Sequence, residues 1–225
     1  MKFAHCFLFS SLLAFLCAAD SGFGAGPAPE TITLPQPAQT GKMSVEEALQ
    51  GRRSVREYQK QPITLSDISQ LLWAAQGISG SGRRTAPSAG ALYPLEMHAV
   101  IGNVTGLSAG VYAYNPRNHE LVRIESGDRR IPLGEAALGQ RPVKNAAAVI
   151  VLAAVYDRTT VKYGERGIRY VHMEAGHAAQ NVLLQAQSLG LGSVVIGAFR
   201  DEEVKAVAGF SREEAPLYLI PVGRK

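Results

Sequence analysis

Cysteine is almost missing from this sequence. The chain of 225 residues has 2 cysteines, Cys6 and Cys17, and both lie close to its start. If these first residues are removed, the mature protein has no cysteine, which excludes disulfides, thiolate catalysis and cysteine metal sites together. We then expect the hydrophobic core, and any partner subunit, to stabilise the fold.

A strong charge of one sign and a long apolar run are missing too. The formal net charge is +4, and acidic and basic residues are mixed along the chain. Nucleic-acid binding needs clustered Lys and Arg on one face, so we expect no nucleic acid as a partner. Because no apolar run of about 20 residues follows the start of the chain, we expect no stable membrane span.

The first residues have the order of a secretory signal peptide. Lys2 precedes a largely apolar stretch (7–15), and small residues then precede the polar Asp20. This order predicts a signal peptide over residues 1–19 and an exported protein, either periplasmic or secreted. Its removal takes away one Lys and no acidic residue, so the net charge falls from +4 to +3. A lipid anchor at Cys17 and a buried N-terminal helix are the alternatives.

Residues 20–42 and 43–225 differ in character. The first segment is rich in Gly, Pro, Ala and Thr and has no periodicity, so we expect a disordered linker. The second is long enough to form one domain with a sizeable core.

Capping boxes and apolar periodicity predict the helices and strands of this domain. Ser44 with Glu47, and Thr64 with Asp67, are typical of helix N-termini. A third, long helix is expected from 169 to 188, with apolar residues along one stripe. The expected strands are 98–101, 111–114, 121–124, 146–155, 193–196 and 217–222. Helices and strands do not strictly alternate, so the fold class is α+β.

Two basic clusters could hold an anion. One follows the first helix and has three arginines and a serine within five residues, and the other closes the chain after the last strand. The paired N–H donors of an arginine guanidinium match the spacing of phosphate oxygens. A solvent-exposed run of charged residues or a frayed C-terminal tail would have the same sequence pattern. The clusters are Arg52, Arg53, Ser54 and Arg56, and Arg224 with Lys225.

The segment from Pro87 to Pro94 follows a glycine-rich loop and reads Pro-Ser-Ala-Gly-Ala-Leu-Tyr-Pro. Its small residues would let the backbone approach a flat ligand, while Ser88 supplies a hydroxyl and Tyr93 a ring. Taken alone, it is also compatible with a structural turn.

These segments, in their order, resemble the nitroreductase superfamily, and in particular its SagB-type branch of dehydrogenases that oxidise azolines in modified peptides. The resemblance covers about residues 44–225. It rests on Arg-Arg-Ser-Val-Arg (52–56), the Pro87–Pro94 segment, Glu-Ala-Gly-His (174–177), Gly-Leu-Gly-Ser-Val-Val-Ile-Gly-Ala-Phe (190–199) and Pro-Val-Gly-Arg (221–224).

The resemblance implies a nitroreductase-like fold, with a central, mostly antiparallel sheet flanked by helices. It also implies an interlocked homodimer around the long helix, and FMN as the cofactor at the interface. The flavin phosphate and ribityl chain would be bound by Arg52, Arg53, Ser54, Arg56 and Arg224, with Lys225 as a further candidate.

Two other segments would contact the flavin ring. The first would come from the other subunit and comprises Pro87, Ser88, Ala89, Gly90 and Leu92. The second comprises Val195, Ile196, Gly197 and Ala198, whose backbone would donate a hydrogen bond to flavin N5. Many members have an acidic residue where Gly197 stands, so only the main chain can serve at that position.

Lys162 and Tyr163 are the catalytic candidates. They follow the central strand and precede the long helix, as a Lys-Tyr pair does in the azoline-oxidising relatives, where it is thought to remove a proton. Lys162 can act as a base only if burial or a nearby cation lowers its pKa. An exposed loop Lys beside a packing Tyr is the alternative.

A metal site is not expected. His172 and His177 are five residues apart on the long helix, so they point about 140° apart, whereas a zinc pair needs a spacing of three or four. A capping or packing role is favoured.

The expected function is an FMN-dependent oxidoreductase that transfers a hydride by a ping-pong mechanism to a small conjugated molecule, such as a quinone or a nitroaromatic. The alternatives are an azoline oxidase of modified-peptide biosynthesis, and a non-catalytic flavin-binding module. The physiological electron donor does not follow from the sequence.

Overall fold

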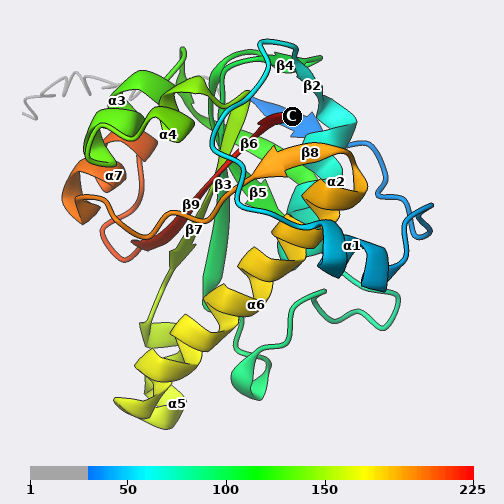
Figure 1. Ribbon diagram of the computed structural model, residues 1–225. Coiled ribbons are helices and arrows are strands. Elements are labelled where there is room, and N and C mark those ends of the chain that lie inside the picture. Colours follow the sequence, from blue (N-terminus) through cyan, green and yellow to red (C-terminus); the bar gives the residue numbers. More distant parts are fainter. Residues whose placement is uncertain (1–29) are drawn as a thin grey trace, which may run out of the picture.

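A computed structural model describes residues 30–225; the predicted signal peptide and both cysteines lie outside this range. The chain forms a sheet with the strand order β1-β6-β5-β3-β7-β9-β8, in which every neighbouring pair is antiparallel (Figure 1). Its strands are β1 (Thr31–Thr33), β3 (Leu95–Ile101), β5 (Gly110–Asn115), β6 (Glu120–Ser126), β7 (Ala148–Ala154), β8 (Leu191–Ser193) and β9 (Ala215–Arg224). A small parallel pair is formed by β2 (Ile63–Thr64) and β4 (Val104–Thr105).

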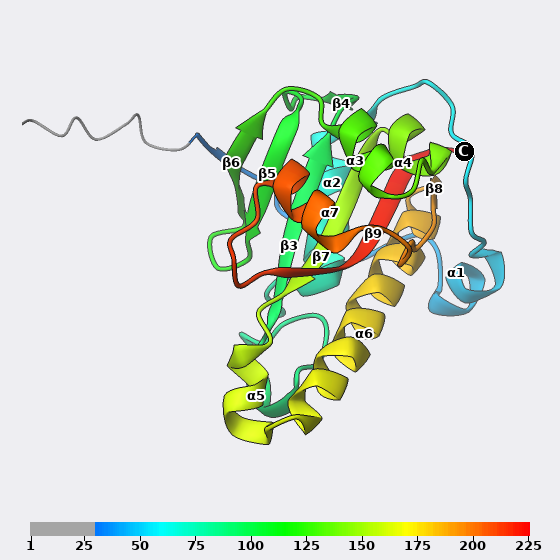
Figure 2. The same cartoon turned by 90° about the vertical axis from the view of Figure 1, so that its left-hand side faces the viewer.

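Helices cover both faces of the sheet. One face packs against α2 and α6, and the other against α3, α4 and α7, which lie in front of the sheet in Figure 2. The helices are α1 (Val45–Gly51), α2 (Leu65–Gln76), α3 (Arg130–Ala136), α4 (Arg141–Asn145), α5 (Asp157–Tyr163), α6 (Arg166–Ser188) and α7 (Asp201–Ala208), with a short 3-10 turn, η1 (Ala89–Ala91). The expected α+β class with a mostly antiparallel sheet is confirmed.

Strand β7 shows why both faces are apolar. Ile150 and Leu152 belong to the core under α2 and α6, while Val149 and Val151 belong to the core under α3 and α7. Alternate residues of a strand point to opposite faces, so a strand covered on both sides must be apolar throughout. The central strand expected within 146–155 is therefore confirmed.

Local capping begins the first two helices where the sequence predicted. The Ser44 Oγ atom accepts from the Glu47 amide at 3.1 Å, and the Glu47 carboxylate accepts from the Ser44 amide at 2.7 Å. Thr64 and Asp67 form the same reciprocal pair before α2. Helix α6 has 23 residues, which makes it about 34 Å long at 1.5 Å per residue.

The linker prediction does not hold for its second half. Strand β1 lies inside the expected linker and pairs with β6, with Ile32 opposite Leu121. Leu34, which follows, is 2% exposed. The segment Thr-Ile-Thr-Leu alternates polar and apolar residues, which is a strand signal that the surrounding prolines and glycines obscure.

Four short helices and one strand end also differ from expectation. Helices α3, α4, α5 and α7 were not predicted, because they are short and begin without a side-chain cap. Strand β8 ends at Ser193 rather than at Ile196, because the chain turns away and Ile196 pairs with Leu219 as an isolated bridge.

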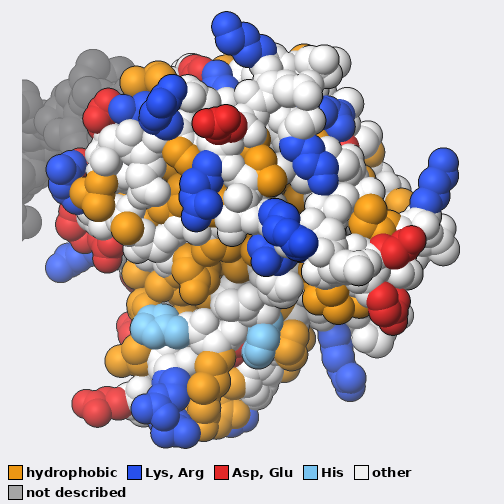
Figure 3. Space-filling model, in the orientation of Figure 1, with side chains coloured by type: hydrophobic (Ala, Val, Ile, Leu, Met, Phe, Trp, Pro, Cys, Tyr) orange, Lys and Arg blue, Asp and Glu red, His pale blue; other side chains and the backbone are white. Residues whose placement is uncertain are grey.

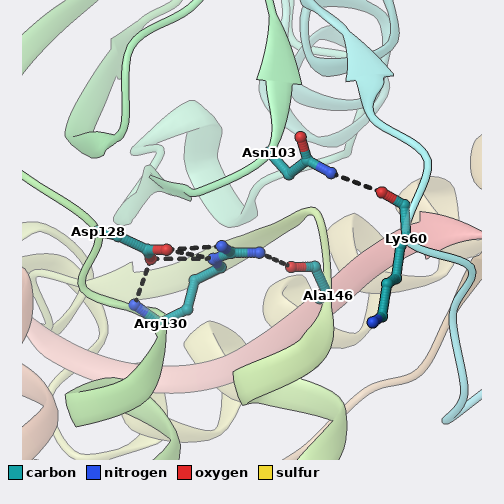
Figure 4. A network of polar contacts seen from close by, with 5 residues as sticks. All are labelled: Lys60, Asn103, Asp128, Arg130 and Ala146. Carbon is teal, nitrogen blue, oxygen red and sulfur yellow. Dashed lines mark hydrogen bonds and ion pairs between the residues drawn. The ribbon is translucent and has the colours of Figure 1, made fainter.

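A polar network far from the candidate site ties α3 to the sheet (Figure 4). The Arg130 Nη1 atom donates to the Ala146 carbonyl at 2.5 Å, and its Nη2 atom lies 2.6 Å from the Asp128 carboxylate. Nearby, the Asn103 amide donates to the Lys60 carbonyl at 2.9 Å.

Within residues 30–225, none of the helices has both the length and the apolar character needed to cross a membrane.

Candidate active site

The basic residues expected to bind phosphate gather at the C-terminal end of α6. The segment after α1 lies against β8, where the Val55 amide donates to the Ser193 carbonyl at 2.9 Å. Gly51 lies against the side chain of Gln187, in the last turn of α6. The Lys225 Nζ atom donates to the Gln187 Oε1 atom at 2.9 Å. The first basic cluster and Lys225 therefore share one end of the long helix.

The arginines of this cluster are free of acidic partners. Across the described range, no carboxylate forms an ion pair with Arg52, Arg53 or Arg56. The Arg53 guanidinium donates to the carbonyls of Gln50 and Arg52, at 2.7 and 2.9 Å. Three uncompensated guanidiniums within five residues fit a phosphate group.

Arg224 is engaged elsewhere. Its Nη2 atom lies 3.0 Å from the Asp67 Oδ2 atom at the start of α2. A phosphate would have to compete with this carboxylate. Lys225 is exposed, and its Cβ atom lies 3.4 Å from the Cβ position of Gly192, next to Val55. The geometry thus favours Lys225 over Arg224 as the C-terminal phosphate ligand.

The segment 195–198 presents two free amides. The Ile196 amide donates to the Leu219 carbonyl at 2.8 Å, so it cannot also donate to a flavin. Gly197 and Ala198 are exposed, and in the described part of the chain neither amide has an acceptor. Val195 packs partly into the core. Gly197 and Ala198 are therefore the exposed amides of this segment that are free to donate to a ligand.

Lys162 and Tyr163 lie at the other end of α6, beside the loop that contains Gly90. A Cβ atom on Gly90 would lie 2.8 Å from the Tyr163 Oη atom and 3.0 Å from the Lys162 Nζ atom. Gly90 has φ +62°, a conformation that favours glycine. The structure thus brings together the expected catalytic pair and the Pro87–Leu92 loop.

Glu174 holds this loop on α6, a role that the sequence did not reveal. It is 4% exposed, and its Oε1 atom accepts from the Ala89 amide at 2.8 Å. Burial raises the pKa of Glu174, while hydrogen bonds from Ala89 and Ser88 act in the opposite direction. The available signal was its position three residues after Val171, on the apolar stripe of the helix.

The two groups of predicted site residues are far apart in one chain. Arg166 begins α6 next to Lys162 and Tyr163, and Gln187 near its end contacts the basic cluster. Arg166 and Gln187 are 21 positions apart, which is about 32 Å along the helix axis, and Glu174, which binds the Gly90 loop, is 13 positions or about 20 Å before Gln187. Figure 1 shows the same separation, with α5 at the lower end of α6 and with α1 and the C-terminus near its upper end.

The cavities of the single chain agree with a divided site. A cavity of about 660 Å³ lies between 36–48, α2 and α6, and none of the predicted cofactor ligands lines it. Binding residues that lie on an open surface enclose no cavity until a second surface covers them. On the face shown in Figure 3, hydrophobic side chains gather between the upper part of the molecule and the lobe that holds α5.

Both histidines of α6 are exposed, and His172 contacts a tyrosine. The His172 Nε2 atom lies 2.6 Å from the Tyr156 Oη atom, and the two rings meet edge to face. His177 lies near enough to Glu174 to affect its pKa. The described residues contain no group of three or more His, Cys, Asp or Glu arranged to hold a metal ion.

Comparison with known proteins identifies the same segments. Residues 49–224 match the model of the Nitroreductase family. A protein of Methanocaldococcus jannaschii that is named as a nitroreductase is 49% identical over 185 residues, which is 82% of this chain and 92% of that protein. The Microcin B17-processing protein McbC of Escherichia coli is 31% identical over 70% of this chain and 61% of its own length.

Two further similarities concern the cofactor and the fold. The NADPH-flavin oxidoreductase of Vibrio harveyi is 29% identical over 46% of each chain. A crystal structure from Ralstonia eutropha, described as a nitroreductase, superposes with a TM-score of 0.75 at 29% identity and covers 89% of this chain and 95% of that one. The match to McbC supports the resemblance to the SagB-type branch.

Proposed function

The chain belongs to the nitroreductase family, and from this premise we propose that it is an FMN-dependent oxidoreductase that works as a homodimer. Family membership and the similarity to a flavin oxidoreductase support oxidoreductase activity with a flavin. The chemistry that bound FMN would supply is hydride transfer at its N5 atom.

One observation carries the proposal. The phosphate-binding candidates lie beside Gln187, near the C-terminal end of α6, whereas the Lys162–Tyr163 pair lies beside the Gly90 loop, which Glu174 binds about 20 Å away along the helix axis, so we infer that two chains complete the site. Two copies related by a twofold axis, with their α6 helices antiparallel, would bring the Pro87–Leu92 loop of one to the arginines of the other.

Exposed apolar side chains are available for such an interface. Val45 and Leu49 on α1 are 64% and 53% exposed, and Ile168 and Met173 on α6 are 43% and 51% exposed. In the proposed dimer, the partner subunit would cover these side chains.

The residues of the chain would divide the work. Arg52, Arg53 and Arg56 would bind the phosphate, together with Lys225. The exposed amides after Ile196 would orient the ring. Lys162 would hold or accept a proton at its Nζ atom.

A small conjugated molecule is the proposed substrate, in a ping-pong reaction in which donor and acceptor use the same site in turn. Azoline oxidation is the second candidate, because McbC is a peptide-processing relative and the Lys162–Tyr163 pair stands beside the loop. We also propose export after removal of residues 1–19, which N-terminal sequencing of the protein recovered outside the cytoplasm would test.

The test is the absorbance spectrum and the mass in solution of the purified mature protein. We expect about one FMN per chain and a dimer. The double variant Arg52→Gln/Arg53→Gln should lose FMN but stay dimeric, whereas Arg212→Gln, an exposed arginine outside the site, should keep both. A colourless monomer that does not bind added FMN contradicts the proposal and leaves a non-catalytic module.

A further inference from the structure

A second cavity lies beside the Pro87–Leu92 loop. It measures about 560 Å³ and is bordered by the end of that loop, the turn between β5 and β6, and α5. We call it the arginine cavity, because its charged lining residues are Arg84, Glu96, Arg117 and Arg158. Three positive charges and one negative charge leave an excess of two positive charges around it.

Only one of these arginines is neutralised. Arg158 forms an ion pair with Glu96, and it also donates to the Tyr93 carbonyl at 3.2 Å. Within the part of the chain that the structure describes, Arg84 and Arg117 have no ion pair with a carboxylate. Both face the cavity with uncompensated charge.

Arg84 is held in place before any ligand arrives. Its Nη1 atom donates to the Gln76 carbonyl at 2.9 Å, and its Cζ atom lies 5.2 Å from the centre of the Tyr93 ring. It is half-buried, and this burial lowers its pKa, against the opposite influence of Glu96. A half-buried guanidinium without a carboxylate partner is costly, and a bound anion would offset that cost.

Arg117 is positioned by its turn. Its amide donates to the Asn115 Oδ1 atom at 3.1 Å, a local bond that fixes the backbone at the tip of the β5–β6 hairpin. The side chain is exposed at the mouth of the cavity. An exposed arginine at the mouth and a half-buried one inside are suited to capturing an anion.

The arginine cavity adjoins the candidate catalytic pair. Arg158 and Lys162 are four residues apart on α5 and therefore lie on one face of that helix. Leu92 lines the cavity, and Gly90, two residues earlier, is close to Tyr163. A molecule anchored in the cavity can thus extend its other end towards Lys162.

We propose that the arginine cavity binds a carboxylate or phosphate group of the substrate, which makes the substrate an anionic conjugated molecule. This inference rests on the proposed function. The anion would take the place of water between Arg84 and Arg117, with the uncharged conjugated part directed towards the flavin side of the loop.

The experiment compares probes that differ in charge but little in size. Calorimetry on the purified holoprotein measures the binding of 4-nitrobenzoate, 4-nitrophenyl phosphate and the neutral 4-nitrobenzamide, and steady-state kinetics with NADPH as the electron donor gives kcat/KM for each. The variants are Arg117→Gln, which removes an exposed side chain, and Arg84→Gln. Arg212→Gln, outside the cavity, is the matched control.

We expect the anionic probes to bind more tightly than the amide, and each cavity variant to weaken them about tenfold, as for the loss of one charged hydrogen bond. The amide and the control should not change. A larger effect on the phosphate ester assigns the site to phosphates, and a larger effect on the benzoate assigns it to carboxylates.

Failure of this inference is distinct from failure of the proposed function. If all three probes bind and are reduced equally in every variant, the redox function stands and the anion site is refuted. If the anions bind in an Arg117-dependent way but no probe is reduced, the anion site stands and the redox function is refuted.

Discussion

Removal of the Glu174 side chain tests whether this buried carboxylate holds the Pro87–Leu92 loop. Glu174→Ala deletes the acceptor of the Ala89 amide, which is bound at 2.8 Å, and a hydrogen bond from Ser88. Losing a partner for partly buried donors costs about 1–3 kcal/mol. Because Ser88 and Ala89 are only half-buried and water can reach them, we expect Glu174→Ala to lower the free energy of unfolding by about 1–2 kcal/mol.

Glu174→Gln is the matched control, because it keeps an oxygen acceptor for Ala89 and loses only the charge. Since the pKa of Glu174 is raised by burial, the folded protein binds its proton more readily than the unfolded chain does. The contribution of this group to stability therefore falls as pH rises through its folded pKa. The Gln variant should escape this loss and gain stability relative to wild type with increasing pH.

Thermal unfolding and hydrogen exchange measure these effects. The Ala variant should unfold about 2–8 °C earlier, from the usual shift per kcal/mol in a domain of this size. Its amides at 88–93 should exchange faster, while those of β7 stay protected. A Tm within 1 °C of wild type in Glu174→Ala, with unchanged exchange in the loop, would show that the carboxylate does not hold the loop.

Three further predictions concern single residues. Burial alone would raise the pKa of Glu214, but its hydrogen bond and ion pair with His98, and hydrogen bonds from Ser211, lower it to about 2. The stability from this pair should therefore be present above pH ~4.5 and lost as pH falls towards 2. Glu214→Gln should flatten that part of an acid-unfolding curve. Gly90→Ala should cost about 1–2 kcal/mol in chemical denaturation, because φ is +62° and Tyr163 leaves no room; an unchanged midpoint argues against this crowding. Lys162→Met should keep FMN, by its spectrum, but lower kcat about a hundredfold or more if it moves a proton, and normal turnover would remove it from the mechanism.

Local sequence determined much of the fold. The capping boxes at Ser44 and Thr64 predicted helix starts because such bonds join residues only three positions apart. The apolar run around Ile150 predicted a strand covered on both faces, because burial on two sides requires it. Strand β1 escaped prediction because its pairing with β6 joins segments about 90 positions apart, and the local composition is that of a linker.

The candidate site shows the same division. Sequence alone identified the basic segment from Arg52, the Pro87–Leu92 loop and Lys162 with Tyr163, because the chemistry of a short motif is carried by the residue types themselves. Only the tertiary structure decided which side chains and amides of these segments are free to bind a ligand. Ion pairs and ladder bonds between distant segments commit Arg224 to Asp67 and the Ile196 amide to Leu219. The length of α6 also separates the two halves of the site, because a rigid helix sets distances that no motif contains.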